Sequence, residues 1–145
     1  MNETRKIRIL IADDFKSLRD VIRLYLERAS SMEVVGEAPE LDQAVARARE
    51  LQPDVIIMND YLPPVDSALA AALFEEQGIP AAILAISMSV EPDLIRRSLE
   101  KGVNGFIHKD EIDTVLVDAI QSIHRGERYL SPKARVAYGS AQDQE

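Results

Sequence analysis

The sequence contains no cysteine, and this absence removes several kinds of chemistry. Disulfide bonds, thiolate metal sites and cysteine nucleophiles are all excluded. Long apolar runs are also missing, because no stretch approaches the roughly 18 apolar residues that a membrane-spanning helix needs. The chain opens without the basic, apolar and small-residue regions of a signal peptide. We therefore expect a soluble, cytoplasmic protein that does not contact membranes.

Basic residues are scarce relative to acidic ones, with 17 Lys and Arg against 25 Asp and Glu and a net charge of −8. Binding to the phosphates of nucleic acid needs clustered Lys and Arg. We therefore expect no direct contact between this chain and nucleic acid. The 145 residues are enough for one domain that buries roughly two thirds of its unfolded surface.

Strand-like and helix-like segments alternate along the chain. Short apolar runs typical of buried strands occur at residues 8–12, 33–38, 55–58, 81–87 and 105–108. Apolar residues at helical spacing follow each run, at residues 18–29, 41–51, 67–77, 91–101 and 112–123. Because parallel strands need helical crossovers, this alternation predicts a doubly wound α/β fold with five parallel strands and five helices.

Polar side chains follow four of the five predicted strands. They are Asp13 and Asp14, Asn59 and Asp60, Ser87, and Lys109. Ligands of open parallel α/β sheets bind at the carboxyl ends of the strands, so these residues are site candidates. Carboxylate, amide and hydroxyl oxygens suit Mg²⁺, and a lysine is a natural countercharge for a phosphoryl group. Each residue alone could be a solvated loop or surface residue, but together they favour phosphoryl binding.

These motifs together resemble the response-regulator receiver domain of two-component signalling. The matching positions are Asp13-Asp14, Pro53-Asp54, Pro63, Asp66, Ser87, and Phe106 preceding Lys109. The resemblance implies a flavodoxin-like sheet with strand order 2-1-3-4-5. Residues 119–132 are similar to the last helix and linker of LuxR/NarL-class receivers, which a DNA-binding domain normally follows. We expect a receiver domain at residues 1–129 and a linker or C-terminal tail without helical periodicity at 130–145, with the output domain absent.

The resemblance also implies a role for each site residue. Asp13, Asp14, Asn59 and the backbone carbonyl of Tyr61 would hold Mg²⁺. Lys109 would be the countercharge of the phosphoryl group, Ser87 the switch hydroxyl and Phe106 the switch aromatic, although Phe106 could equally be a plain core residue. Ser67 stands where the family usually has glycine, and we expect this difference to be neutral because a helix start tolerates serine.

The phosphoacceptor position carries an amide. Receivers use an aspartate there to attack a phosphohistidine, and the resemblance puts Asn59 at that position. Asp60 is the alternative, since Pro64 lies at the expected offset from it, but Ser67 then replaces an expected acid. Because side chains alternate along a strand, we expect Asp60 to point away from the pocket that Asn59 faces and to have no role there. Asn59 could be natural or an engineered substitution, and the intact remainder of the site favours an engineered or recent change.

Several functions follow from these expectations. The leading hypothesis is a regulatory receiver, not an enzyme, that cannot be phosphorylated as written and binds Mg²⁺ weakly because of Asn59. Its implied partners are a histidine kinase and either an output domain or a second copy, bound through residues 91–123 or through the first and last predicted helices. The alternatives are a phosphorylation-independent pseudo-receiver for docking or ligand sensing, and a small Mg²⁺-dependent phosphatase with Asp13 as nucleophile. A phosphatase would want an acid where Phe15 stands.

Overall fold

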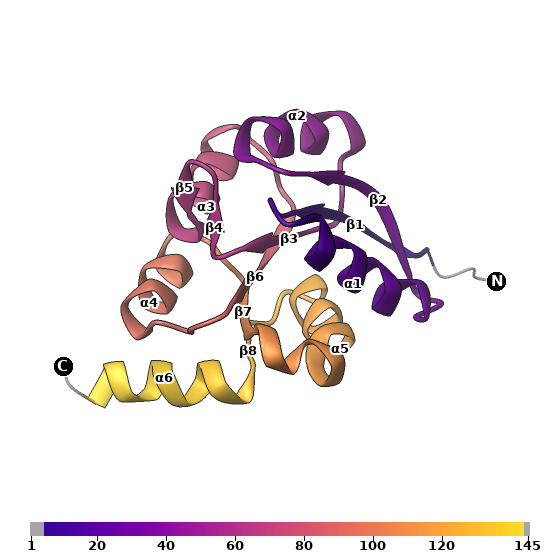
Figure 1. Ribbon diagram of the computed structural model, residues 1–145. Helices are drawn as coiled ribbons and strands as arrows, with labels where there is room; N and C mark the ends of the chain where they lie inside the picture. Colours follow the sequence, from indigo (N-terminus) through magenta and orange to yellow (C-terminus); the bar gives the residue numbers. More distant parts are fainter. Residues whose placement is uncertain (1–4, 144–145) are drawn as a thin grey trace.

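A six-stranded parallel sheet forms the centre of the molecule, in the order β2-β1-β3-β6-β7-β8 (Figure 1). The structure is a computed structural model that describes residues 5–143, and for residues 140–143 the backbone alone. The strands are β1 (Ile7–Ala12), β2 (Met32–Ala38), β3 (Val55–Asn59), β6 (Ala82–Ser87), β7 (Gly105–His108) and β8 (Tyr129–Leu130). The five expected strands stand in the expected order, and β8 is a sixth that we did not predict. A short antiparallel pair, β4 (Tyr61–Leu62) and β5 (Val65–Asp66), lies between β3 and α3 (Ser67–Glu76).

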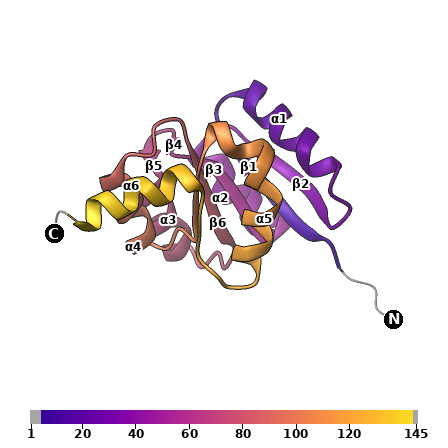
Figure 2. The same ribbon diagram turned by 90° about the horizontal axis from the view of Figure 1, so that it is seen from below.

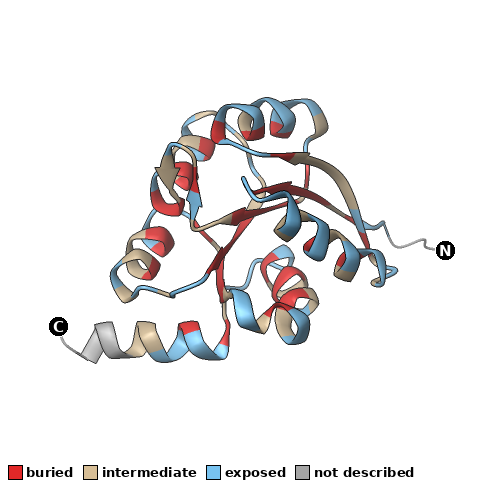
Figure 3. Ribbon diagram, in the orientation of Figure 1, coloured by how far each residue is buried: buried red, intermediate tan, exposed pale blue. Residues whose placement is uncertain are grey.

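Helices cover both faces of the sheet (Figure 2). One face packs against α1 (Lys16–Glu27) and α5 (Ile112–His124), and the other against α2 (Leu41–Leu51), α3 and α4 (Pro92–Glu100). Neighbouring strand residues alternate between the two cores, so that Ile9 and Ile11 belong to one and Leu10 and Ala12 to the other. Figure 3 shows the result, a sheet whose central strands are buried between two helical layers. Within residues 5–143, no helix combines the length and apolar character needed to cross a membrane.

The segment after β8 forms a sixth helix, α6 (Pro132–Asp143), which lies beside α4 (Figures 1 and 2). The expectation that residues 130–145 lack helix is therefore wrong for 132–143, and residues 144 and 145 lie outside the described part. Ser131 precedes a proline at the first helical position, and the Ser131 hydroxyl accepts a hydrogen bond from the Ala134 amide at 3.4 Å. A serine cap followed by proline is a helix-start signal that could have revealed α6. Whether the domain boundary falls at 129 stays a prediction.

Candidate functional site

The register of the strands brings the predicted site residues to one edge of the sheet. Ala12 pairs with Met58 and Asn59 pairs with Ile86, so that the residues following β1 stand beside the end of β3. A cavity of about 170 Å³ opens at this edge. It is lined by Phe15, Ser17, Leu18, Asn59, Ile86, Ser87, Met88 and Lys109. The structure therefore brings the side chains predicted for the acceptor, the switch hydroxyl and the phosphoryl countercharge to a single cavity.

Asp13 follows β1 and is buried, with 2% of its surface exposed. Its Oδ1 accepts a hydrogen bond from the Phe15 amide at 2.8 Å, and its backbone carbonyl accepts one from the Arg19 guanidinium at 2.6 Å. Burial raises the pKa of the Asp13 carboxyl to about 6, and the charge of Asp14 raises it too, against the lowering effects of the Phe15 amide, Arg19 and Lys109. A buried carboxylate with a raised pKa is a group that a bound cation would stabilise.

The residues predicted to bind metal suit Mg²⁺ in the type of their donor atoms, because all of them offer oxygen. Asp13 and Asp14 supply carboxylates, but Asp14 and Tyr61 are exposed. The Asn59 side-chain oxygen accepts a hydrogen bond from the Asp60 amide at 3.0 Å. Across the described residues, no three His, Cys, Asp or Glu side chains are grouped closely enough to share a metal ion. An amide at Asn59 leaves the site one negative charge short of a three-carboxylate arrangement.

Ser87 lines the cavity, but its hydroxyl is hydrogen bonded to groups that do not. Its hydroxyl donates to Asp60 Oδ2 at 2.8 Å and accepts from the amides of Ser89 at 3.1 Å and Val90 at 3.0 Å. Asp60 does not line the cavity that contains Asn59, in agreement with the alternation of side chains along β3. The hydrogen bond between the Asp60 carboxylate and the Ser87 hydroxyl is a contact that we did not predict.

The start of α3 is joined to α4 by two side-chain contacts. Asp66 caps α3, with Oδ1 accepting from the Leu69 amide at 3.0 Å, while Oδ2 pairs with Arg97 of α4 at 3.2 Å. The Ser67 hydroxyl lies 2.8 Å from the Ser98 hydroxyl, and both residues are fully buried. Ser67 is therefore not a neutral difference from glycine, because it contributes a buried hydrogen bond between α3 and α4.

Phe106 lies in the core on the same face as α4. It is fully buried in the apolar cluster that contains Ile95, Leu99 and Ala134. Its backbone carbonyl accepts a hydrogen bond from the Ser131 amide at 3.1 Å, just before α6 begins. The aromatic ring is thus enclosed from the side of α4 and α6, and its role as a switch stays a prediction.

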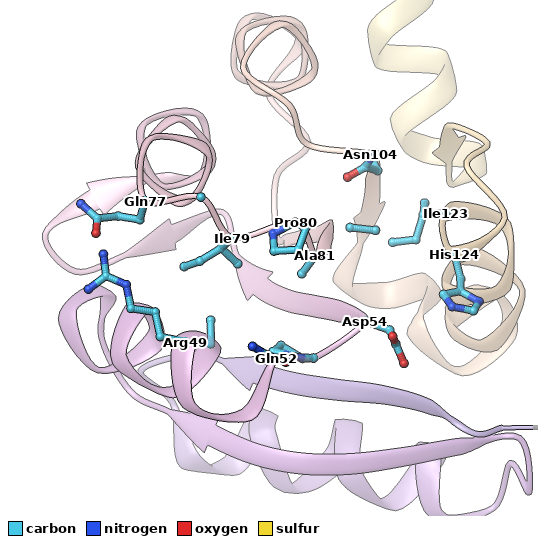
Figure 4. A pocket seen from close by; sticks show the side chains of 14 residues that line it. Arg49, Gln52, Asp54, Gln77, Ile79, Pro80, Ala81, Asn104, Ile123 and His124 are labelled. Carbon is cyan, nitrogen blue, oxygen red and sulfur yellow. The ribbon is translucent and has the colours of Figure 1, made fainter.

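A larger cavity, of about 720 Å³, lies at the opposite edge of the sheet (Figure 4). Two of its polar lining residues are engaged within the protein. Asp54 accepts hydrogen bonds from the Arg8 amide at 2.8 Å and from Arg5 at 3.1 Å, and Asn104 accepts one from the Ile83 amide at 2.8 Å. None of the predicted site residues lines this cavity, so the smaller one is the candidate functional site.

Comparison with known proteins agrees with the geometry. A sequence model of the response regulator receiver domain matches residues 9–121. The response regulator protein VraR of Staphylococcus aureus is 31% identical over 130 residues, which are 90% of this chain and 62% of VraR. The chain thus spans less than two thirds of the length of this curated relative.

Solved structures show the same similarity. A LuxR-family two-component response regulator from Aurantimonas sp. SI85-9A1 superposes with a TM-score of 0.89 at 28% identity, over 94% of this chain and 98% of that chain. The signal receiver domain of the response regulator NarL from Mycobacterium tuberculosis superposes with a TM-score of 0.80 at 30% identity, over 85% of this chain and 99% of that chain.

Proposed function

We propose that this chain, which belongs to the response regulator receiver domain family, is the receiver of a LuxR/NarL-type transcription regulator. The members of this family are regulatory modules. In our proposal, Asn59 makes this receiver unable to accept a phosphoryl group. One observation supports this above all others. Asn59 ends β3 and lines the same cavity as Ser87 and Lys109, where an acceptor carboxylate would need to stand. An amide lacks the anionic oxygen that attacks a phosphohistidine.

The remaining groups of the site keep the character of a phosphoryl pocket. Asp13 and Asp14, with the Asn59 side-chain oxygen and the Tyr61 carbonyl, would hold Mg²⁺, which supplies positive charge for a phosphoryl group. Lys109 adds a positive charge at the edge of the cavity. We infer that the loss of one carboxylate weakens Mg²⁺ binding without removing it.

The chain would act through its conformation and its surfaces. The proposed partners are a histidine kinase and either an output DNA-binding domain or a second copy of the chain. Of the two surfaces considered, the one on α4, β7 and α5 is partly occupied by α6, which packs on α4 and β7. The other surface, on α1 and α5, carries the exposed apolar side chains of Val21 and Leu24 on α1.

Mass spectrometry of the intact chain tests the proposal directly. The chain and its Asn59→Asp variant are incubated with Mg²⁺ and a small phosphoryl donor such as acetyl phosphate. We expect a single added phosphoryl group on the Asn59→Asp variant and none on the chain as written. Phosphorylation of the present chain at Asp60 would contradict the proposal, as would an Asn59→Asp variant that folds but stays unmodified.

A pseudo-receiver that senses a small ligand is the second candidate, and the rim of the cavity favours it. Phe15 is 59% exposed and Met88 68% exposed, and both line the cavity that Asn59 enters. Binding of a weakly polar ligand there would not need phosphoryl chemistry. A Mg²⁺-dependent phosphatase is supported less, because Phe15 occupies the position of its second acid and its amide already binds Asp13.

A further inference from the structure

The hydroxyl of Ser87 has all of its hydrogen-bonding capacity in use. A serine hydroxyl carries one proton and two lone pairs. The proton is donated to Asp60 Oδ2, and the lone pairs accept from the amides of Ser89 and Val90. Ser87 itself is buried, with 1% of its surface exposed. Nothing at Asn59 can receive the Ser87 proton unless the contact with Asp60 is broken.

The segment that Ser87 holds is conformationally unusual. Val90 has a φ of 44°, in the left-handed region that a β-branched residue rarely adopts. Such a residue persists only when surrounding contacts hold it in place. The Ser87 hydroxyl is one of these contacts, since it accepts from the Val90 amide at 3.0 Å. Two residues after Val90, α4 begins at Pro92.

Asp60 is itself firmly placed. Its amide donates to the Ile86 carbonyl at 2.8 Å, and its carbonyl accepts from the Ser67 amide at 2.8 Å. A hydrogen bond to an ionised carboxylate is stronger than one between neutral groups. The Asp60 carboxylate, which does not line the Asn59 cavity, therefore fixes the direction of the Ser87 hydroxyl.

We propose that Asp60 is a positioning residue that holds the Ser87 hydroxyl, and through it the turn from β6 to α4, in one conformation whatever occupies the Asn59 cavity. In this arrangement a side chain of the protein supplies the acceptor for Ser87. For signalling, this would mean a receiver whose β6–α4 turn is held by its own Asp60 side chain. This consequence rests on the proposed receiver function. The anchor itself does not, because it involves no phosphoryl group.

Amide hydrogen exchange of Ser89 and Val90, followed by NMR on the full chain, measures the anchor. We expect Asp60→Ala to raise both exchange rates about tenfold, because the hydroxyl loses a charged partner. Ser87→Ala should raise them at least as much, and the double variant no further than Ser87→Ala alone. Asp118→Ala, which removes an exposed carboxylate from α5, is the charge-matched control and should leave both rates unchanged. Asp60→Asn, which keeps the size of the side chain, serves if Asp60→Ala does not fold, and should raise both rates by a smaller factor.

Two results would overturn the anchor. One is exchange rates within twofold of the parent in both Asp60 variants. The other is a double variant whose effect equals the product of the two single effects, because independent residues would give that result.

The signalling consequence has its own measurement. In an Asn59→Asp background, beryllofluoride with Mg²⁺ serves as the phosphoryl probe, and the Ser89 and Val90 amide signals are followed. We expect small shifts with Asp60 present and at least twofold larger shifts in Asn59→Asp/Asp60→Ala. Equal shifts would show that Asp60 does not insulate the turn. If the probe fails to bind Asn59→Asp, the proposed receiver site is wrong while the exchange experiment still decides the anchor.

Discussion

At the carboxyl ends of the strands, the two faces of the sheet satisfy their polar groups in different ways. On the side of α1 and α5, Asn59 and Lys109 face an open cavity, and Asp13 is buried with a raised pKa. On the side of α3 and α4, Ser87 is hydrogen bonded to Asp60, and Ser67 to Ser98. We call the side of α1 and α5 the open side and the side of α3 and α4 the closed side. The open side has polar groups that an added cation or anion would stabilise, whereas the closed side needs no ligand.

This difference bears on how the chain could act without phosphorylation. The Asn59 side chain lies on the open side. Within residues 5–143, its one side-chain hydrogen bond is with the amide of the adjacent Asp60. Two polar contacts of α4, those of Arg97 with Asp66 and of Ser98 with Ser67, belong to the closed side. We infer that the position of α4 depends on internal contacts more than on the occupant of the cavity.

Truncation of Phe106 should give the largest contrast between the two sides. Phe106→Ala removes a fully buried ring on the closed side and should lower the free energy of unfolding by about 3–5 kcal/mol. Lys109→Ala removes an exposed side chain at the open side and should change it by less than about 0.5 kcal/mol. Urea denaturation of both variants gives the comparison. Similar costs for the two would show that the sides do not differ in packing.

The pH dependence of stability should report on Asp13. Its folded pKa of about 6 lies above the ordinary value of 3.8, so the folded state favours the protonated form. The stabilisation is fully present below about pH 4 and is lost as the pH rises through about 6, at a cost of up to about 3 kcal/mol without Mg²⁺. Thermal or urea unfolding of the chain and of Asp13→Asn across this range measures it. Because other groups also titrate, the difference between the two curves is the test, and parallel curves would contradict the assignment.

The fold was largely predictable because its strands and helices are long enough to show their periods. The segments at 41–51 and 105–108 were placed with the observed bounds. The sixth strand was missed because two residues, Tyr129 and Leu130, cannot show an alternation. Helix α6 was missed because its polar sequence shows no apolar period, although Ser131-Pro132 is a helix-start signal.

The open side of the site was also predictable, but the closed side was not. The rule that ligands bind at the carboxyl ends of parallel strands selected Asn59 and Lys109 on the open side, and also Ser87, which borders the same cavity although its hydroxyl is bonded on the closed side. The Asp60–Ser87 bond joins residues 27 positions apart and the Ser67–Ser98 bond residues 31 apart. No sequence pattern identifies which of several polar side chains will meet over such separations, because that depends on how helices pack on the sheet.

Restoring the carboxylate at Asn59 should change the open side without strengthening the fold. Three carboxylates about 5 Å apart repel by roughly 3 kcal/mol per pair at an effective dielectric constant of 20, and Mg²⁺ relieves this repulsion. We expect Asn59→Asp to bind Mg²⁺ about tenfold more tightly and to be no more stable than the parent without metal. Calorimetric titration with Mg²⁺ and metal-free unfolding measure the two quantities. Equal Mg²⁺ affinity in both proteins would argue against the placement of the metal site.

The smallest effect concerns the hydrogen bond between α3 and α4. Ser98→Ala leaves the buried Ser67 hydroxyl without its partner, which should cost about 1 kcal/mol of unfolding free energy. Ser67→Ala/Ser98→Ala removes both hydroxyls and should cost less than the sum of the two single variants, because the double variant leaves no buried hydroxyl unpaired. Ser17→Ala, an exposed serine on the open side, is the matched control and should be neutral. Additive costs at Ser67 and Ser98 would mean that the two hydroxyls do not depend on each other, and the ion pair of Asp66 with Arg97 would then be the remaining side-chain link described between the start of α3 and α4.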